Sequence, residues 1–334
     1  MNKPLKIAMV GDGGWGTTLA LLLAKKGHRV ALWSPFAEYA SVLREKRENV
    51  KFLPGVRIPK EIIISSDMAE VLSGAEVVTL AAPSHFMRSV VERMKGFSFS
   101  ERLVVSVSKG IENGTLFRMS EVIQDVLGKL KLAVLSGPTI APEVARGLPA
   151  MAVAASDDDR ISAKIQDVFN TDTFGVYRND DMTGVELGGS LKNVIAIAAG
   201  ISDGLGLGTN TKAALFTRGL VEMARLGVKM GARTETFSGL SGMGDLVTTC
   251  LSPESRNRSF GEKIGRGEKV EEILKGTEQV VEGVRTTLSA VALGRRHPKE
   301  MPITHQIKEV LYDGKDPRKA VKELMERPRE REQK

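Results

Sequence analysis

Cysteine, aromatic residues and long apolar runs are scarce in this sequence, and each scarcity excludes a class of protein. Its 334 residues include one cysteine, Cys250, which excludes an internal disulfide framework. No apolar run approaches the roughly 20 residues of a membrane-spanning helix, and the start of the chain lacks the apolar stretch of a signal peptide. We therefore expect a soluble, cytoplasmic protein without membrane insertion.

Aromatic side chains make up only 5% of the chain, although the net charge is +7 and the pI is about 9.4. Lysine and arginine are scattered, and no aromatic platform accompanies them, so nucleic-acid binding is not expected. A positive field suits an enzyme whose cofactor and substrate are both phosphorylated, because it raises their encounter rate.

Histidine is also rare, with four residues in the chain. His28 lies in a predicted helix-to-strand turn, His85 starts a helical stretch, and His297 and His305 fall in C-terminal connections. None has metal-ligand spacing to another His, Cys or carboxylate, and no Ser-His-Asp signature is present, so we predict no metal site. Lysine is the better candidate for a proton donor.

Apolar segments alternate with helical patterns through the first half of the chain. The strand-like segments are 6–10, 29–33, 62–65, 77–81, 103–107 and 132–135, and the helical ones are 17–26, 36–47, 84–94 and 117–127. Strands that are apolar throughout are typical of a parallel sheet covered on both faces. We predict a doubly wound, Rossmann-type α/β domain over residues 1–183.

Strand-like segments vanish after Gly184, and helical patterns replace them. These patterns cover 185–202, 210–230, 255–265, 284–294, 304–311 and 317–327. The sequence therefore predicts a mostly α-helical substrate-binding domain over residues 184–334. Helical domains of this kind can form homodimers, but no contact face is readable from the sequence.

A glycine loop over residues 11–16 fits the pattern Gly-x-Gly-x-x-Gly, directly after the first strand and at the start of the first helix. In this context Gly11 permits a tight turn, Gly13 lets the backbone approach a pyrophosphate, and Gly16 allows close helix–strand packing. The pyrophosphate would meet free N–H groups at the helix N-terminus. A second glycine cluster, 204–208, follows no strand and is interpreted as a helix–helix connection.

Lys192 is the unexpected charge of the second domain. It shares a helix face with small and apolar residues, and no other charge lies on that face. The small neighbours suggest a cavity with room for a substrate, and burial would lower the pKa of the amine toward a value useful for proton transfer. The alternative is a lysine whose stem alone is buried at the domain junction.

Other polar clusters follow predicted strands or start a helix. Ser108-Lys109-Gly110 and Gly137-Pro138-Thr139 lie after strand ends, at the edge where open α/β sheets bind ligands. Segment 252–257 has the signals of a helix N-terminus, where an anion would meet free N–H groups and Arg256. A surface charge at Lys109 and plain capping at 252–257 are the alternatives.

Cofactor preference is left open by the end of the second strand. Trp33-Ser34-Pro35 supplies neither the acidic residue that typically binds an NAD ribose nor an immediate arginine for an NADP phosphate. The basic residues at 44, 46 and 47 fit a solvated helix face better. The sequence therefore predicts NAD or NADP without resolving the preference.

These motifs resemble bacterial NAD(P)-dependent glycerol-3-phosphate dehydrogenases over nearly the whole chain. The segments that carry the resemblance are 11–16, 108–110, 135–138, 143–149, 191–196, 217–220, 244–246, 255–257, 280–283 and 300–303. Two departures are visible: the family often has Ser where this chain has Thr139, and Arg or His where Pro35 stands. The resemblance implies interconversion of dihydroxyacetone phosphate and sn-glycerol 3-phosphate, supplying glycerol 3-phosphate for phospholipid synthesis.

The resemblance also implies residue roles. Lys192 would be the catalytic proton donor and acceptor. The substrate would contact Lys109, Gly137, Thr139, Lys192, Asp245, Ser255, Arg256 and Asn257. Besides the glycines of the loop, the cofactor would contact Gly14, Trp15, Lys109, Ala141, Arg256, Val280 and Glu282. Like-charge repulsion from Lys109 would lower the pKa of Lys192.

Two other functions compete with this one. A β-hydroxyacid dehydrogenase pairs a similar cofactor domain with a helical domain and a helix-borne lysine, a pattern that Gly188 and Lys192 fit. Segments 255–257 and 135–149 favour the phosphorylated substrate instead. A non-catalytic NAD(H)-sensing protein would not need Lys192 on an apolar face.

Overall fold

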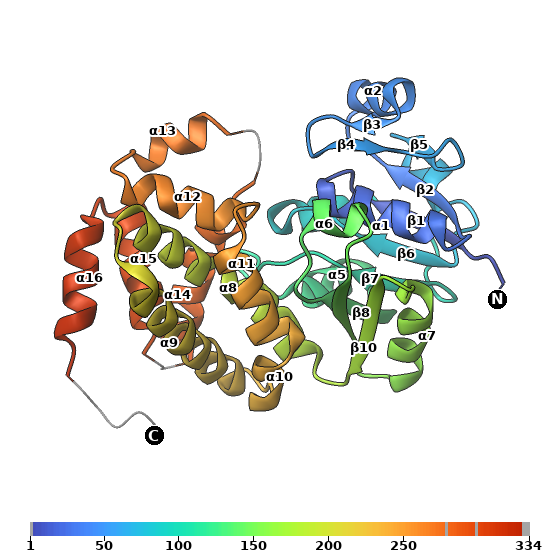
Figure 1. Ribbon diagram of the computed structural model, residues 1–334. Helices are drawn as coiled ribbons and strands as arrows, with labels where there is room; N and C mark the ends of the chain where they lie inside the picture. Colours follow the sequence, from blue (N-terminus) through green and yellow to red (C-terminus); the bar gives the residue numbers. More distant parts are fainter. Residues whose placement is uncertain (1–2, 278–279, 298–299, 329–334) are drawn as a thin grey trace.

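A sheet of eight strands forms the centre of the N-terminal half of the molecule (Figure 1). The computed structural model describes residues 3–277, 280–297 and 300–328. The strands are β1 (Lys6–Val10), β2 (Arg29–Trp33), β5 (Ile63–Ser65), β6 (Val77–Leu80), β7 (Leu103–Ser106), β8 (Lys131–Ser136), β9 (Ala150–Ala155) and β10 (Phe174–Asn179). Their order is β10-β9-β8-β7-β6-β1-β2-β5. Six neighbouring strands, in the spatial order β5-β2-β1-β6-β7-β8, have the Rossmann arrangement, which confirms the predicted fold class.

Helices cover both faces of this sheet. On one face lie α1 (Gly14–Lys25), α2 (Ala37–Lys46) and α7 (Asp159–Phe169), and on the other lie α3 (Met68–Leu72), α4 (Met87–Glu92) and α5 (Met119–Leu127). Alternate residues of β1 enter opposite cores: Ile7 and Met9 face α1, whereas Ala8 and Val10 face α3 and α4. Burial on both faces explains why the strands are apolar throughout.

The sheet departs from the prediction at one edge, where β9 runs antiparallel to β8. Neither β9 nor its parallel neighbour β10 was predicted. Alanine-rich β9 has low strand propensity. A small hairpin of β3 (Glu48–Asn49) and β4 (Leu53–Arg57) was also missed, since β4 contains Pro54 and Gly55. Two short elements complete this half: η1 (Ser84–Phe86) and α6 (Ala141–Ala145).

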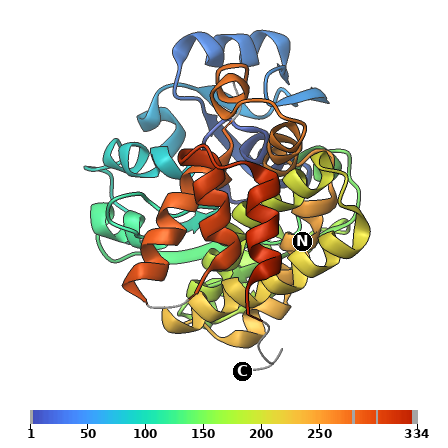
Figure 2. The ribbon, with the colours of Figure 1, turned by 90° about the vertical axis from the view of Figure 1, so that its left-hand side faces the viewer.

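The second half is helical, as predicted (Figures 1 and 2). It is built around α8 (Met182–Gly204). The predicted domain boundary between residues 183 and 184 falls within the first turn of this helix. The other elements are α9 (Gly208–Lys229), α10 (Thr234–Ser238), η2 (Leu240–Gly244), α11 (Asp245–Leu251), α12 (Arg256–Gly265), α13 (Val270–Lys275), α14 (Glu282–Arg296), α15 (Pro302–Tyr312) and α16 (Pro317–Glu326). The glycine cluster at 204–208 joins α8 to α9, which confirms its interpretation as a helix connection.

Helix α8 is the core of this domain. Among the described helices it alone has the length and apolar composition of a membrane span, and its apolar window is 100% buried inside the protein. Glycines allow backbones to approach it closely: a Cβ on Gly200 would clash with the carbonyl oxygen of Arg258, and one on Gly261 with that of Ile197. Burial among packed helices explains the apolar composition of α8.

Glu186, in the first half of α8, fastens the helical domain to the Rossmann-type domain. Its buried carboxylate accepts hydrogen bonds from the backbone N–H of Ser120 at 2.8 Å, the Ser120 hydroxyl at 2.6 Å and the Arg118 guanidinium at 2.7 Å. The contact closes the N-terminus of α5, where free N–H groups favour a negative charge. A side chain of one domain thereby caps a helix of the other.

Candidate active site

The glycine loop connects β1 to α1 at the carboxyl edge of the sheet. Gly11 has φ = +124°, and a Cβ there would press on the backbone of Ala81, so only glycine fits. A Cβ on Gly16 would clash with the carbonyl oxygen of Gly11, whereas one on Gly13 would meet nothing within 4 Å. The two outer glycines therefore serve the packing of the loop, and the middle one faces open space.

The start of α1 fits an anionic cofactor. No side chain caps the helix at Gly13 and no acidic residue lies in its first turn, so the first N–H groups are available to a pyrophosphate. Gly14 lies beside Ala141, the first residue of α6. The backbone carbonyl of Ala141 accepts a hydrogen bond from the Thr18 hydroxyl. The Trp15 ring is half-buried against Phe174, with centroids 6.2 Å apart.

Asp12, within this loop, has a carboxylate that the sequence analysis did not use. It is 8% exposed, and one of its oxygens accepts a hydrogen bond of 2.5 Å from the hydroxyl of Ser34, the first residue after β2. Asn49 of the β3–β4 hairpin donates to the backbone carbonyl of Asp12 at 2.6 Å and to the Thr17 hydroxyl at 2.7 Å. Burial raises the pKa of Asp12, and the bond from Ser34 acts in the opposite direction.

Lys192 is buried in the middle of α8, with 6% of its surface exposed. Its ammonium donates to Asp245 Oδ1 at 2.7 Å and to the Thr249 hydroxyl at 2.5 Å. Asp245 and Thr249 lie one turn apart on α11, so both oxygens face the same point of α8. The alternative of a lysine with only its stem buried is wrong, because the charged end itself is enclosed.

Lys109 reaches the same carboxylate from the Rossmann-type domain. Its ammonium lies 2.6 Å from Asp245 Oδ2 and donates to the carbonyl oxygen of Gly137 at 3.0 Å. Asp245 therefore bridges two lysines of different domains. Burial lowers the pKa of Lys192 to about 8; the nearby Asp245 opposes this shift and the positive charge of Lys109 adds to it.

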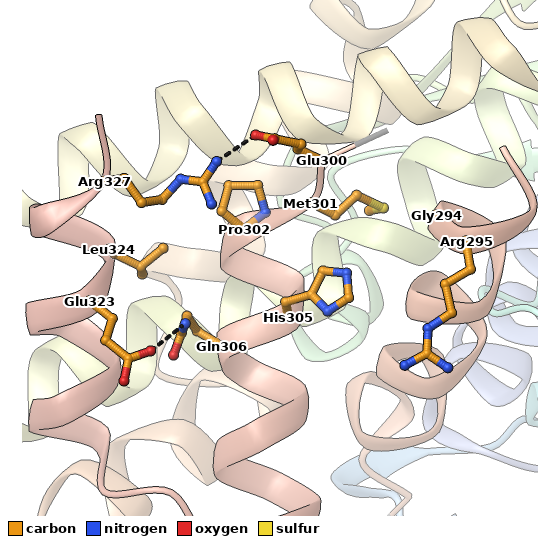
Figure 3. A pocket seen from close by; sticks show the side chains of 10 residues that line it. All are labelled: Gly294, Arg295, Glu300, Met301, Pro302, His305, Gln306, Glu323, Leu324 and Arg327. Atoms are coloured by element: carbon orange, nitrogen blue, oxygen red, sulfur yellow. Dashed lines mark hydrogen bonds and ion pairs between the residues drawn. The ribbon is translucent and has the colours of Figure 1, made fainter. Parts of the chain in front are cut away.

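The two glycines beside Lys192 do not open a cavity, contrary to the prediction. A Cβ on Gly188 would clash with the carbonyl oxygen of Ser241, and one on Gly189 with the Ser136 hydroxyl, because the protein fills that space. A surface pocket of about 790 Å³ lies elsewhere, between α14, α15 and α16 (Figure 3). No predicted site residue lines it. The glycines of α8 serve close packing instead.

Segment 252–257 is a capped helix start, as predicted. Ser255 is the N-cap of α12 and its hydroxyl accepts from the N–H of Arg258 at 3.2 Å. The exposed Arg256 guanidinium makes no hydrogen bond or ion pair to any residue that the structure describes. Asn257 points the other way: it donates to Asn193 Oδ1 at 2.9 Å and accepts from the N–H of Gly283 at 2.8 Å. Asn257 thus ties α12 to α8 beside Lys192.

Glu282 begins α14 and reaches into the Rossmann-type domain. Its carboxylate accepts from the N–H of Ser84 at 3.1 Å and from the Ser84 hydroxyl at 2.5 Å, at the start of η1 after β6. Burial raises the pKa of Glu282, against the bonds from Ser84. Val280, just before α14, is half-buried. Glu282 therefore lies at the junction of the two domains.

Thr139 keeps its hydroxyl within its own loop, where it donates to the carbonyl oxygen of Gly137 at 3.2 Å. Two further groups of the site escaped the sequence analysis. Thr249 follows Asp245 by four residues, a helical spacing that marks it once the helix is known. Nothing in the sequence around Ser84 indicates a role in the site, because its hydrogen-bond partner Glu282 is 198 residues away. Among the described residues, no group of three His, Cys, Asp or Glu side chains could hold a metal ion.

Comparisons with known proteins agree with this geometry. Residues 6–162 match the family NAD-dependent glycerol-3-phosphate dehydrogenase N-terminus, and residues 181–322 match the corresponding C-terminus family. A protein of Syntrophotalea carbinolica, named glycerol-3-phosphate dehydrogenase, NAD(P)+, is 50% identical over 326 residues, covering 97% of this chain and 98% of its own. One of Citrifermentans bemidjiense with the same name is 51% identical over 325 residues, covering 96% and 97%.

Solved structures give the same result. The crystal structure of glycerol-3-phosphate dehydrogenase from Coxiella burnetii is 41% identical, with a TM-score of 0.94 over 97% of this chain and 99% of that chain. The enzyme of Saccharomyces cerevisiae is 25% identical, with a TM-score of 0.81 over 97% and 100%. With a Rossmann-type domain, a helical domain and a buried lysine between them, the chain belongs to the NAD-dependent glycerol-3-phosphate dehydrogenase family.

Proposed function

We propose that this chain interconverts dihydroxyacetone phosphate and sn-glycerol 3-phosphate, with Lys192 as the proton donor and acceptor. The observation that carries the proposal is that Asp245 forms ion pairs with both Lys109 and Lys192. These ion pairs join the two domains at the carboxyl edge of the sheet. A lysine with a pKa of about 8 can both give and take a proton near neutral pH. No other function considered above uses this group together with a phosphate site.

The cofactor would be held by the glycine loop and the start of α1, with its far end toward the lysines. Gly14 and Ala141 flank the uncapped helix end, and Glu282 reaches Ser84 from the helical domain. We assign Val280 to the same cofactor site, as the family resemblance implies. When bound, a reduced nicotinamide supplies the hydride that the carbonyl carbon of the substrate needs. We also assign cofactor contacts to Trp15, Lys109 and Arg256, as the family resemblance implies.

Lys192 would protonate the C2 oxygen of dihydroxyacetone phosphate during reduction and accept a proton from the C2 hydroxyl during oxidation. Asp245 and Thr249 hold the ammonium by two hydrogen bonds, which fixes the direction of its remaining N–H. Lys109, held by the other oxygen of Asp245, would supply a second positive charge beside the substrate oxygen. Positioning by a shared carboxylate lets both lysines act on one small molecule.

The phosphate of the substrate would bind Arg256 and the N-terminus of α12. A guanidinium can hold two phosphate oxygens at once, and the helix dipole favours an anion at this end. Asn257 would fix the distance between this phosphate site and Lys192 through its bond to Asn193, the next residue of α8. Remote binding energy would thereby orient the ketone for reaction. We assign Gly137, Thr139 and Ser255 to the same substrate site.

We further propose that the reaction runs in the synthetic direction in the cytoplasm and supplies glycerol 3-phosphate for membrane phospholipids. Residues 1–183 would bind the cofactor and residues 184–334 would complete the substrate site. A homodimer through the helical domain stays a prediction, which sedimentation at several protein concentrations tests.

The direct test is the loss of reduced-nicotinamide absorbance when dihydroxyacetone phosphate is added to the purified protein. We expect rapid oxidation that depends on the phosphorylated ketone and is absent with dihydroxyacetone. Oxidation with a β-ketoacid but not with dihydroxyacetone phosphate would overturn the proposal. So would the absence of oxidation by folded protein that binds the cofactor.

A further inference from the structure

The carboxylate of Asp12 lies between the carboxyl ends of two neighbouring strands. Asp12 follows β1, and its partner Ser34 directly follows β2. In Rossmann-type domains the ribose of the adenosine half binds at the end of the second strand, where an acidic side chain typically accepts a hydrogen bond from its 2′-hydroxyl. Residues 33–35 lack that acid, but the loop after β1 brings one to the same place.

The charge of this carboxylate has no cationic partner among the described residues. Three arginines lie on neighbouring elements, and each is engaged elsewhere. Arg44 donates to the carbonyl of Ile64, Arg47 to those of Pro59 and Ile62, and the Arg93 guanidinium lies 4.8 Å from the centre of the Trp33 ring. Burial raises the pKa of Asp12, as expected for an acid whose charge is not compensated.

The contacts of Asp12 also hold its position firmly. Ser34 is fully buried, its hydroxyl donates to Asp12 Oδ2, and its own N–H is bonded to the carbonyl of Ser65 at 2.9 Å. Asn49 fixes the backbone of Asp12 from the other side. The other carboxylate oxygen, Oδ1, receives no hydrogen bond from the side chain or backbone of any other described residue, so it is available to a ligand hydroxyl.

We infer that Asp12, held by Ser34, selects a cofactor with a free ribose 2′-hydroxyl and disfavours one with a 2′-phosphate. The hydroxyl of NAD(H) would donate to Asp12, whereas the phosphate of NADP(H) would place a second anion beside an uncompensated carboxylate. Like charges placed together in a poorly hydrated site are strongly unfavourable. The inference rests on the proposed function, because it requires a dinucleotide in the glycine loop.

The test measures binding alone, by isothermal titration calorimetry with ADP-ribose and with 2′-phospho-ADP-ribose. These probes carry the adenosine half of each cofactor and undergo no reaction. We expect the native protein to bind ADP-ribose at least about tenfold more tightly, a difference of about 1.4 kcal/mol. Equal binding, or tighter binding of the 2′-phosphate, would overturn the inference without any mutation.

Three variants separate charge from structure. Asp12→Asn keeps the size of the side chain and removes its charge, so the preference should fall about tenfold, mainly through tighter binding of the 2′-phosphate. Ser34→Ala keeps the carboxylate but removes the hydrogen bond that positions it, so the preference should weaken, by less than in Asp12→Asn. Glu76→Gln removes an equal charge just before β6, at the amino end of the parallel strands and away from the cofactor loop. It should change neither affinity.

Each remaining outcome decides the matter. An unchanged preference in Asp12→Asn would show that the carboxylate does not select the cofactor. Absence of binding by both probes to the native protein would contradict the dinucleotide site itself, and therefore both the proposed function and this inference. Tight binding of ADP-ribose with no preference would leave the proposed function intact and overturn this inference alone.

Discussion

Asn193 of α8 and Asn257 of α12 are joined by a hydrogen bond of 2.9 Å between their side chains. Each lies next to a residue with an assigned chemical role, because Asn193 follows Lys192 and Asn257 follows Arg256. The bond therefore fixes the distance between the backbone positions of Arg256 and Lys192. If these two residues have the roles proposed above, the pair of asparagines sets the spacing between phosphate and ketone.

Replacing Asn257 with alanine should weaken both stability and substrate binding. The N–H of Gly283 and the amide of Asn193 would lose their partner in a buried region, at a cost of about 1–3 kcal/mol in the free energy of unfolding. Thermal or urea unfolding measures the first effect, and KM for dihydroxyacetone phosphate the second. Asn210→Ala, on the exposed start of α9, is the matched control and should change neither.

Replacing Lys192 with methionine should lower kcat by about 10²–10⁴, the usual contribution of a positioned general acid. Methionine has a similar length and suits the buried site, so cofactor affinity should be largely kept. Steady-state kinetics and a cofactor titration measure the two quantities. Lys229→Met, at the exposed end of α9, serves as the control. Normal turnover by the Lys192 variant would remove the residue from the mechanism.

The pH dependence of the two reaction directions should differ in sign. Reduction needs protonated Lys192, so its kcat should fall as the pH rises through about 8. Oxidation needs the neutral amine, so its kcat should rise over the same range. Measuring both directions with buffers of constant ionic strength tests this prediction. Parallel profiles in the two directions would mean that another group carries the proton.

Asp245→Asn should move both profiles toward lower pH. The carboxylate favours the charged form of Lys192, whereas burial and Lys109 disfavour it, so removing the negative charge lowers the pKa of Lys192 below its present value of about 8. Asp159→Asn removes the same charge at an exposed site beside Arg178 and should leave the profiles in place. Unshifted profiles in a folded Asp245 variant would contradict the assigned coupling.

Arg256→Lys should raise KM for dihydroxyacetone phosphate on the order of tenfold, because an ammonium cannot bind two phosphate oxygens as a guanidinium does. The fold should be unaffected, since the Arg256 side chain is exposed and makes no ion pair with a described residue. Arg266→Lys, after the last turn of the same helix, is the matched control. An unchanged KM would exclude Arg256 from the phosphate site.

Much of this architecture could be predicted from the sequence because burial leaves a clear pattern. Strands covered on both faces are apolar throughout, and Lys192 stands out as the one charge on an apolar helix face. The glycine loop was recognisable because its place between a strand and a helix gives each glycine a separate task. Segments with one strong physical requirement were therefore identified correctly.

The rest was hidden because it depends on partners far apart in the chain. Nothing near Ser84 indicates that it receives the carboxylate of Glu282, and Asp12 could not be placed beside Ser34 before the register of β1 and β2 was known. The expected cavity beside Lys192 was wrong for a related reason. Small residues permit either a void or a closely packed backbone, and only the tertiary structure decides between them.

Three carboxylates of the helical half accept hydrogen bonds from side chains of the Rossmann-type half. Glu186 accepts from Ser120 and Arg118, Asp245 from Lys109, and Glu282 from Ser84. If one half unfolded alone, these hydrogen bonds between the two halves would all be lost. The energetic penalty of a half-folded molecule is therefore high, and such species should be scarcely populated. Scanning calorimetry should record one cooperative transition, with equal calorimetric and van't Hoff enthalpies, for a chain that carries two cores.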